Sequence, residues 1–183
     1  LDITNQHSPE EKAESLTKGE LSWVSQADCL RNPDSRIVLS GPITGKLLEN
    51  YASYHNGICS GDYPRFGRLF WENSQVSSGW AYQQSTVSRT GFYLGREHIF
   101  NWQDGEGQFY EFVCERLGEN RVSSWIRGGE AWNKHGIAIS PTGNLKATLY
   151  TGELFDDNTI VVVPSKEQYL PAIWAFCSSD DYH

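Results

Sequence analysis

The residues best suited to chemistry in this sequence are four arginines between positions 57 and 96. They are Arg65, Arg68, Arg89 and Arg96, and the same segment holds only two acidic residues, so its local charge is +2. An arginine side chain can grip a phosphate or a guanine edge through two parallel hydrogen bonds. The pattern indicates contacts with nucleic acid; the alternative is an ordinary scatter of surface charge.

Three residues in the middle of this segment have side chains that commonly contact DNA: Tyr82, Gln83 and Gln84. Glutamine can pair with an adenine edge, and tyrosine can bond to a phosphate. Glycines on both sides would let the backbone approach a phosphate closely. We therefore expect these three side chains to join the four arginines in a DNA-contacting surface.

The rest of the chain is acidic. The 183 residues carry a net charge of −8, with −3 in residues 1–56 and −7 in residues 97–183. Because free nucleic-acid-binding domains usually carry a basic excess, this total argues against a DNA binder that acts alone. Met occurs at no position, position 1 included. We therefore expect a fragment of a longer chain whose other parts complete the positive surface.

The composition predicts a folded, soluble protein. Hydrophobic residues make up 38% and aromatic residues 13% of the chain, enough for a core at this length. The polar start, Leu1–Glu14, does not resemble a signal peptide, and every apolar run is too short to span a membrane. The four cysteines form no Cys-x-x-Cys pair, so we expect free thiols in a reducing cytoplasm and no zinc site.

Two short motifs imitate functional sites but lack the residues that those sites require. Gly41–Leu47 has three residues between its glycines and a leucine after the lysine, whereas a phosphate-binding loop needs four residues and then Ser or Thr. Asn32–Ser35 lacks the second proline and the aromatic residue of the adenine-methylase motif, which holds a flipped adenine. We therefore expect neither nucleotide binding nor methyl transfer from these motifs.

Periodicity and capping residues predict an α+β fold in a single domain, with a mixed or antiparallel sheet and about four helices. The expected helices are Ser8–Lys18, Lys46–Tyr54, Gln108–Leu117 and Leu170–Cys177. Gly67–Trp102 should be rich in strands because short aromatic segments alternate with Gly and Ser. The other expected strands are Arg36–Ser40, Ser123–Ile126, Gly136–Ser140, Lys146–Thr151 and Thr159–Val163.

Three stretches of the sequence contain motifs that are more specific than any of these predicted elements. Asn56–Glu72 fits the pattern Gly-x-x-(Thr/Ser)-Gly-x-x-x-Arg-Phe, in which Arg65 is the arginine. Gly79–Trp102 runs from Trp80-Ala81-Tyr82, where the similar family segment has Trp-x-x-Tyr, through Tyr-Leu-Gly to Asn-Trp. Ile126–Ser179 contains Arg-Gly-Gly-Glu-Ala-Trp, Leu-Tyr-Thr-Gly and finally Pro-Ala-Ile-Trp-Ala-Phe-Cys-Ser-Ser.

In this order, the three stretches resemble the target-recognition (specificity) region of large bacterial adenine-N6 DNA methyltransferases. These enzymes belong to restriction-modification and BREX-type phage-defence systems, and the region is related to the TaqI-like C-terminal specificity domain. The resemblance covers roughly residues 36–182. Family members have a glycine-rich S-adenosylmethionine loop and a Pro-Pro-aromatic motif, and neither is found in this sequence.

The resemblance implies a function for the chain as part of a larger enzyme. Residues 1–35 would be a helical lead-in, and residues 36–183 a DNA target-recognition domain that is incomplete at its C-terminus. The ligand would be double-stranded DNA, and an upstream domain of the same parent would bind S-adenosylmethionine and transfer the methyl group. The fragment itself would hold no cofactor and would lie in the bacterial cytoplasm. Arg127 and Lys134, in the third stretch, join the candidate DNA contacts.

Two alternatives come from other functional classes. A carbohydrate-binding module would use the many Trp and Tyr residues as stacking platforms for sugars. Such modules are usually secreted, which fits poorly with unpaired cysteines and no export signal. A protein-interaction domain with no ligand of its own is the second alternative. A contiguous positive face favours DNA binding, whereas a row of exposed rings favours sugar binding.

Overall fold

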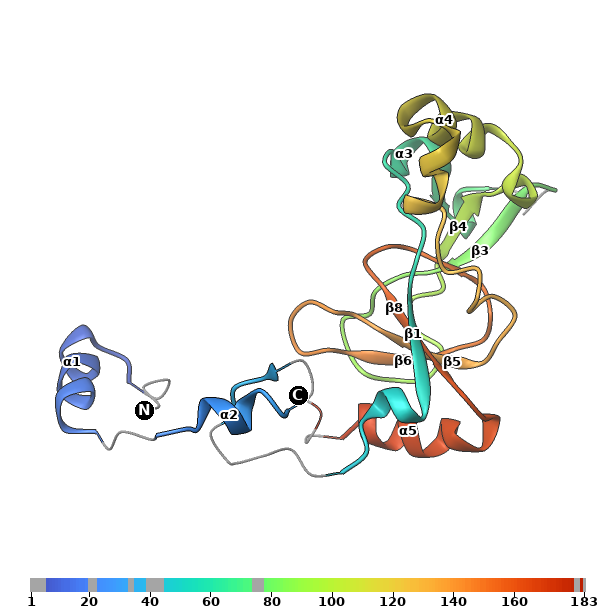
Figure 1. The fold of residues 1–183 in the computed structure, drawn as a ribbon. Helices are drawn as coiled ribbons and strands as arrows, with labels where there is room; N and C mark the ends of the chain where they lie inside the picture. The colour runs from blue at the N-terminus through green and yellow to red at the C-terminus, as the bar shows by residue number, and fades with distance from the viewer. Residues whose placement is uncertain are drawn as a thin grey trace. The chain divides into compact units, whose positions relative to one another are not determined.

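The computed structural model of this chain describes residues 6–19, 23–32, 35–38, 45–73, 78–179 and 182. The chain divides into two compact units, Leu1–Lys46 and Leu47–His183. The first unit contains the helices α1 and α2, and the second contains every strand within the described ranges (Figure 1). From the sequence we expected a division after residue 35.

Helix α1, Pro9–Lys18, begins as its sequence predicts. The Ser8 hydroxyl accepts a hydrogen bond from the Glu11 amide (3.1 Å), and the Glu11 carboxylate accepts one from the Ser8 amide (3.1 Å). This reciprocal pair satisfies two amides that would otherwise lack partners at the start of the helix. A second, short helix, α2, spans Gln26–Cys29.

Several expectations for the first unit fall partly on positions that the structure does not describe. In the expected strand Arg36–Ser40, residues 36–38 have no regular secondary structure, and residues 39–40 lie outside the described residues. Residues 33–34 of the Asn-Pro-Asp-Ser motif and residues 41–44 of the Gly-rich motif also lie outside them.

An antiparallel sheet forms one half of the second unit, with its strands in the order β1-β8-β5-β6. These strands span Ala52–Asn56 (β1), Ile160–Pro164 (β8), Gly136–Ile139 (β5) and Ala147–Tyr150 (β6). Helix α5, Leu170–Cys177, follows β8 and lies at this end of the unit (Figure 1). Its Ile173 and Cys177 pack against Ala52, Ile137 and Val162. Burial there raises the pKa of the Cys177 thiol to about 11.

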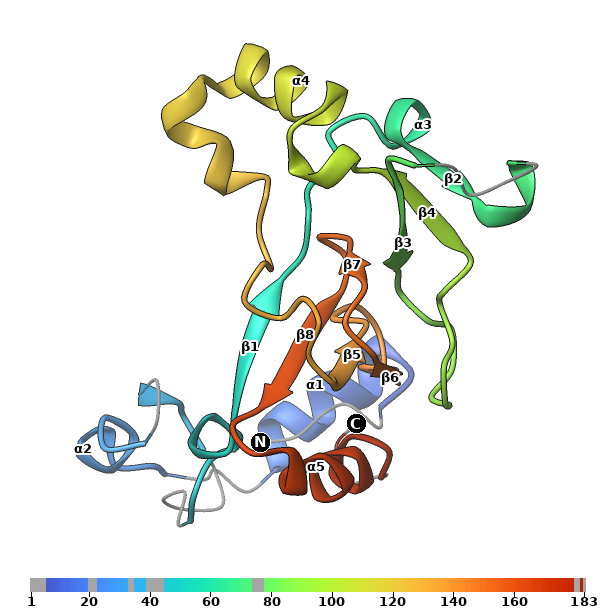
Figure 2. The same cartoon turned by 90° about the vertical axis from the view of Figure 1, so that its right-hand side faces the viewer.

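A mixed sheet forms the other half, in the order β2-β4-β3-β7, and its only parallel pair is β3 with β7. The strands span Gly67–Leu69 (β2), His98–Asn101 (β4), Trp80–Gln84 (β3) and Leu154–Phe155 (β7). Helices α3, Tyr63–Phe66, and α4, Gln108–Leu117, lie beside this sheet (Figure 2). Phe66, Phe100 and Phe109 meet between them, with ring centroids 4.9–6.3 Å apart.

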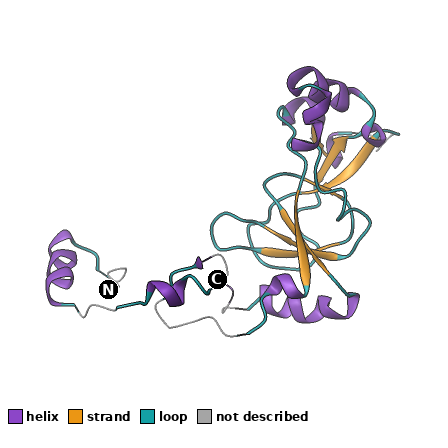
Figure 3. Ribbon diagram, in the orientation of Figure 1, coloured by secondary structure: helices purple, strands orange, loops and turns teal. Residues whose placement is uncertain are grey.

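The α+β class and the mixed and antiparallel sheets are confirmed (Figure 3), as are the helices predicted at 108–117 and 170–177. Five short 3₁₀ helices complete the described elements of the second unit. They are η2 (Leu48–Asn50), η3 (Phe70–Glu72), η4 (Gln103–Gly105), η5 (Glu119–Ser124) and η6 (Glu167–Tyr169). No helix in the described ranges is long and apolar enough to cross a membrane.

Two predicted elements are wrong. The helix expected at Lys46–Tyr54 is instead one 3₁₀ turn, η2, followed by strand β1. Pairing with all five residues of β8 decides this segment, because tertiary hydrogen bonding overrides a weak helical pattern. The strand expected at Ser123–Ile126 is instead the end of η5, where the Trp125 amide bonds to the Val122 carbonyl (3.0 Å).

Three of the chain segments that connect the two sheets, Gly57–Cys59, Trp125–Gly128 and Phe155–Asp157, lie against one another, and we call them the neck. The Ile58 amide donates to the Phe155 carbonyl (2.8 Å), and the Cys59 amide donates to the Trp125 carbonyl (2.9 Å). A side-chain carbon on Gly57 would overlap the carbonyl oxygens of Phe155 and Asp156. Only glycine therefore permits this close approach of the backbones.

We predict that Gly57→Ala destabilises the second unit by about 1–3 kcal/mol, the usual cost of forcing an extra carbon into a packed site. Urea unfolding followed by tryptophan fluorescence measures the change. Gly129→Ala is the matched control, because its new carbon would meet only Trp132 at an ordinary 3.8 Å. The control should change stability by less than about 0.5 kcal/mol. If both substitutions lower the free energy of unfolding equally, the backbones do not approach Gly57 as closely as in this structure.

Candidate nucleic-acid interface

Strand register places two candidate DNA contacts in one row across the mixed sheet. Arg68 of β2 pairs with Ile99 of β4, which pairs in turn with Tyr82 of β3. Residues directly opposite each other in neighbouring strands project from the same face of a sheet. The next row of this face holds Asn101 and Trp80, which also pair directly.

This face of the sheet, which we call the outer face, points away from α4. Phe100 alternates with Ile99 along β4 and therefore projects from the opposite face, where it contacts Phe109 of α4. On the outer face, Tyr82 is 51% exposed, whereas Ile99 is fully buried. The outer face thus combines an apolar centre with polar and aromatic residues around it.

Arg65 lies next to this row in sequence, on helix α3, and is exposed. Its guanidinium lies over the rings of Phe66 and Phe112, at 4.9 and 5.2 Å from their centroids. Within the described part of the chain, Arg65 forms no ion pair. Its charge therefore remains available to an anion, and the ring contacts limit how far the side chain can swing.

Arg68 is half-buried and is partly held by the backbone. Its Nη1 donates to the carbonyl oxygens of Pro64 and Gly67, the latter at 2.6 Å. A guanidinium has five N–H donors, so donors remain for an external acceptor. Arg68 and Tyr82 are the predicted site residues that the structure brings together in one row, whereas the Arg65 guanidinium lies over rings on the α4 side of the sheet.

Gln83 and Gln84 are not surface residues, and their predicted DNA contacts are therefore corrected. Their exposed fractions are 1% and 0%. The Gln84 side-chain amide donates to the carbonyls of Ser85 (2.8 Å), Leu94 (2.8 Å) and Gly95 (3.1 Å). These hydrogen bonds hold the two ends of the loop between β3 and β4 together. The Gln83 amide has no hydrogen-bond partner among the described residues.

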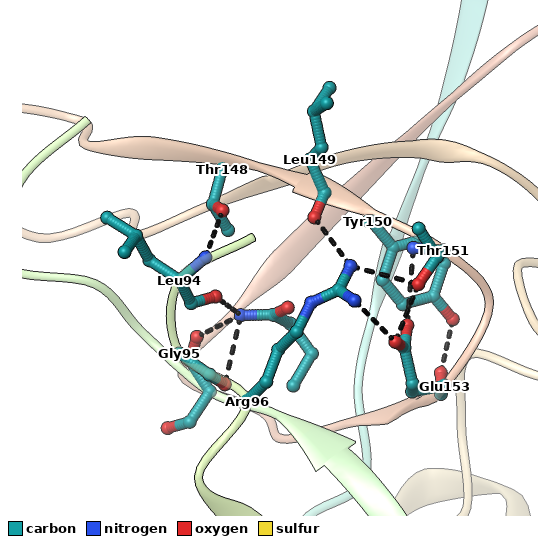
Figure 4. A network of polar contacts seen from close by, with 10 residues as sticks. Leu94, Gly95, Arg96, Thr148, Leu149, Tyr150, Thr151 and Glu153 are labelled. Atoms are coloured by element: carbon teal, nitrogen blue, oxygen red, sulfur yellow. Dashed lines mark hydrogen bonds and ion pairs between the residues drawn. The ribbon is translucent and has the colours of Figure 1, made fainter. Parts of the chain in front are cut away.

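Arg96 is half-buried and bonded to other parts of the chain, so the structure does not place it with Arg68 and Tyr82 (Figure 4). Its Nη2 donates to the Leu149 carbonyl (3.2 Å) and to the Thr151 hydroxyl (2.9 Å), and its Nη1 lies 3.3 Å from the Glu153 carboxylate. The guanidinium also lies 4.9 Å from the Tyr93 ring centroid. These contacts join the start of β4 to the segment that follows β6.

Arg89 is exposed, but the loop that carries it, residues 85–95, lies along the antiparallel sheet. The Leu94 amide donates to the Thr148 hydroxyl (2.8 Å), and the Gly91 amide donates to the Ala147 carbonyl (3.1 Å). The structure therefore separates Arg89 from the row that contains Arg68, because the Arg89 loop is bonded to β6 of the other sheet.

The two candidates from the third stretch also lie apart from the outer face. Arg127 is half-buried, and its Nε donates to the Gly57 carbonyl in the neck (3.1 Å). Lys134 is exposed beside a shallow pocket that it shares with His135 and Glu167. Arg127 therefore has a structural role, whereas Lys134 is free to contact a ligand elsewhere on the surface.

A polar cluster near the neck was not anticipated from the sequence. The Ser85 hydroxyl donates to the Asp156 carboxylate (2.5 Å), and so does the Thr159 hydroxyl (2.8 Å). Burial raises the pKa of Asp156, and these two hydrogen bonds oppose that rise. The Tyr63 hydroxyl lies 2.5 Å from His98 Nδ1. Because Ser85 donates to a carboxylate, its hydroxyl is not paired with a histidine base as in a hydrolase.

Trp80 and Asn101 are further outer-face residues that sequence reasoning missed. Simple alternation from Tyr82 would have found Trp80, but only strand pairing identifies Asn101 as its neighbour. Among the described residues, no group of three His, Cys, Asp or Glu side chains could hold a metal ion. Neither a protein-family model nor a curated protein sequence matches this chain.

We predict that Arg96→Ala lowers the free energy of unfolding by about 1 kcal/mol, because it removes two hydrogen bonds and a half-buried ion pair that join separate parts of the chain. Arg89→Ala is the matched control and should change that free energy by less than about 0.5 kcal/mol, since Arg89 is exposed. Chemical denaturation of both variants measures the difference. An Arg96→Ala protein as stable as the control would show that these contacts are not structural.

Proposed function

We propose that the Leu47–His183 unit binds double-stranded DNA and serves as a target-reading part of a site-specific adenine-N6 DNA methyltransferase. The observation that carries this proposal is the row of Arg68 and Tyr82 on the outer face of the mixed sheet, with the exposed Arg65 three residues before Arg68 on helix α3. In the parent chain, an upstream domain would bind S-adenosylmethionine and perform the methyl transfer. Bacterial restriction-modification or phage defence in the cytoplasm is the setting that this proposal implies.

The chemistry of the outer face, together with the neighbouring Arg65, suits both parts of DNA recognition. Arg65 and Arg68 can neutralise phosphates, which fixes the position of the duplex. Asn101 can pair with an adenine edge, and Tyr82 and Trp80 offer a hydroxyl and an indole N–H. Ile99 is buried and pairs with both Arg68 and Tyr82, so the backbones of these two residues are held at a fixed separation.

The proposed positive surface is small, because the structure uses Arg96 and Arg127 internally. With a net charge of −8, the isolated chain should bind DNA weakly, with a dissociation constant of about 10⁻⁴ to 10⁻⁶ M at physiological salt. Other segments of the parent would supply the remaining phosphate contacts.

We predict that Arg65→Ala weakens DNA binding and lowers the salt slope of the affinity by about one unit, because one counterion fewer is released. Fluorescence anisotropy with a labelled duplex at several salt concentrations measures both quantities. Arg121→Ala, which removes an exposed arginine of η5 far from β2 in the sequence, is the control and should leave the slope unchanged.

The variant Arg65→Lys distinguishes a contact with a phosphate from a contact with a guanine edge. A lysine can replace arginine at a phosphate as a point charge but cannot form the paired hydrogen bonds to a guanine. If DNA affinity is the same in wild type, Arg65→Ala and Arg68→Ala, neither Arg65 nor the outer face binds DNA. Stacking of oligosaccharides on Tyr82 with no DNA binding would favour the carbohydrate alternative.

We also predict that the isolated chain transfers no methyl group, because its sequence contains neither a glycine-rich cofactor loop nor an intact adenine-binding motif. The measurement is transfer of label from S-adenosylmethionine to DNA of mixed sequence. A full-length adenine methyltransferase is the positive control. Transfer above background by the purified chain would mean that it carries its own catalytic site.

A further inference from the structure

A cleft of about 800 Å³ lies between η4, α4 and η5, and its chemistry is opposite to that of a DNA-binding surface. Three carboxylates line it, from Asp104, Glu106 and Glu119, and none of its lining residues is Lys, Arg or His. A phosphate would meet only repulsion there. The volume is within the usual range for a small-molecule site.

Aromatic rings form the walls of this cleft. Trp102 and Trp132 meet edge to face, with centroids 5.2 Å apart and planes at 78°. Tyr110 of α4 contributes a third ring and is 38% exposed. The Trp132 indole N–H is buried and has no hydrogen-bond partner among the described residues. Electron-rich ring faces beside carboxylates attract organic cations, because the cation gains from both.

The turn that carries Asp104 is held in place before any ligand arrives. The amides of Trp102 and Gln103 both donate to the Gly79 carbonyl (2.8 Å each). The Gln103 side-chain oxygen accepts from the Gln108 amide (2.9 Å) and so caps the start of α4. Asp104 itself has a left-handed backbone conformation (φ 55°), which Asn and Asp tolerate better than most residues.

We propose that this cleft binds an organic cation, either a guanidinium or an alkylammonium group. The carboxylates supply the charge, the rings supply the faces, and the fixed turn lowers the cost of ordering the site. The same group occurs in a free polyamine and in an Arg or Lys side chain of a polypeptide. The site shares no residue with the outer face, so it stands independently of the proposed DNA contact.

The test is a titration of the full chain followed by NMR of the Trp102 and Trp132 indole N–H resonances. The probes are spermidine, the blocked peptides Gly-Arg-Gly and Gly-Lys-Gly, and two neutral compounds, Gly-citrulline-Gly and maltotriose. Citrulline has nearly the shape of arginine without its charge, so it isolates the contribution of the cation. We expect saturable shifts with the cationic probes that weaken as salt rises, and none with the neutral probes.

Variants of the carboxylates test the same site without disturbing its walls. Asp104→Asn and Glu119→Gln should each weaken cation binding roughly two- to fivefold, the range for a partly exposed ion pair. Glu115→Gln is the matched control, because Glu115 lies on α4 but does not line the cleft. Tighter binding of spermidine than of the peptides would identify a free polyamine as the source, and the reverse order would identify a polypeptide side chain.

Three outcomes would overturn the proposal. They are equal binding of the arginine and citrulline peptides, preferential binding of maltotriose, and unchanged affinity in the carboxylate variants. None of them bears on DNA binding, which depends on Arg65 and Arg68. Conversely, Arg65→Ala should leave cation binding unchanged, so the two proposals fail separately.

Discussion

The close approach of backbones in the neck is the constraint on which the rest of the second unit depends. Ile58 bonds to Phe155 through its amide, and Gly57 leaves room for the Phe155 and Asp156 carbonyls. Gly128 does the same on the other side, where an added carbon would lie 2.6 Å from the Phe155 ring. Each sheet has its own aromatic or aliphatic core, so these contacts fix how the two cores are held together.

Several arginines that resemble binding residues are used to reinforce this connection. Arg127 bonds to the Gly57 carbonyl, and Arg96 ties the start of β4 to the segment after β6. Gln84 performs a similar role by satisfying three carbonyls at the base of the β3–β4 loop. A buried carbonyl without a donor is costly, so side chains with several N–H groups are well suited to such junctions.

The two sites proposed on the second unit are lined by side chains of opposite charge. Arg65 and Arg68 lie at α3 and β2, whereas Asp104, Glu106 and Glu119 line the cleft beside α4. An anionic duplex is attracted to the first region and repelled by the second. The two proposed sites therefore suit ligands of opposite charge, and a net charge of −8 does not exclude a local anion-binding face.

The sequence by itself determined the local elements whose hydrogen bonds close within a few residues. Helix α1 follows from the reciprocal pair of Ser8 and Glu11, and the helices at 108–117 and 170–177 follow from their apolar spacing. The α+β class followed from the same short-range signals. The sequence also identified Arg65 and Tyr82 as exposed candidates, because Arg and Tyr often lie at binding surfaces.

Only the tertiary structure decided which polar side chains face solvent. Gln83, Gln84 and Arg96 look like surface residues in the sequence, but the two glutamines are buried and Arg96 bonds to residues 53 and 55 positions away. Strand pairing likewise turned the segment before Asn56 from a predicted helix into β1. The cause is the same in each case: long-range contacts bury a side chain or satisfy a backbone group, and no local pattern of residues records them.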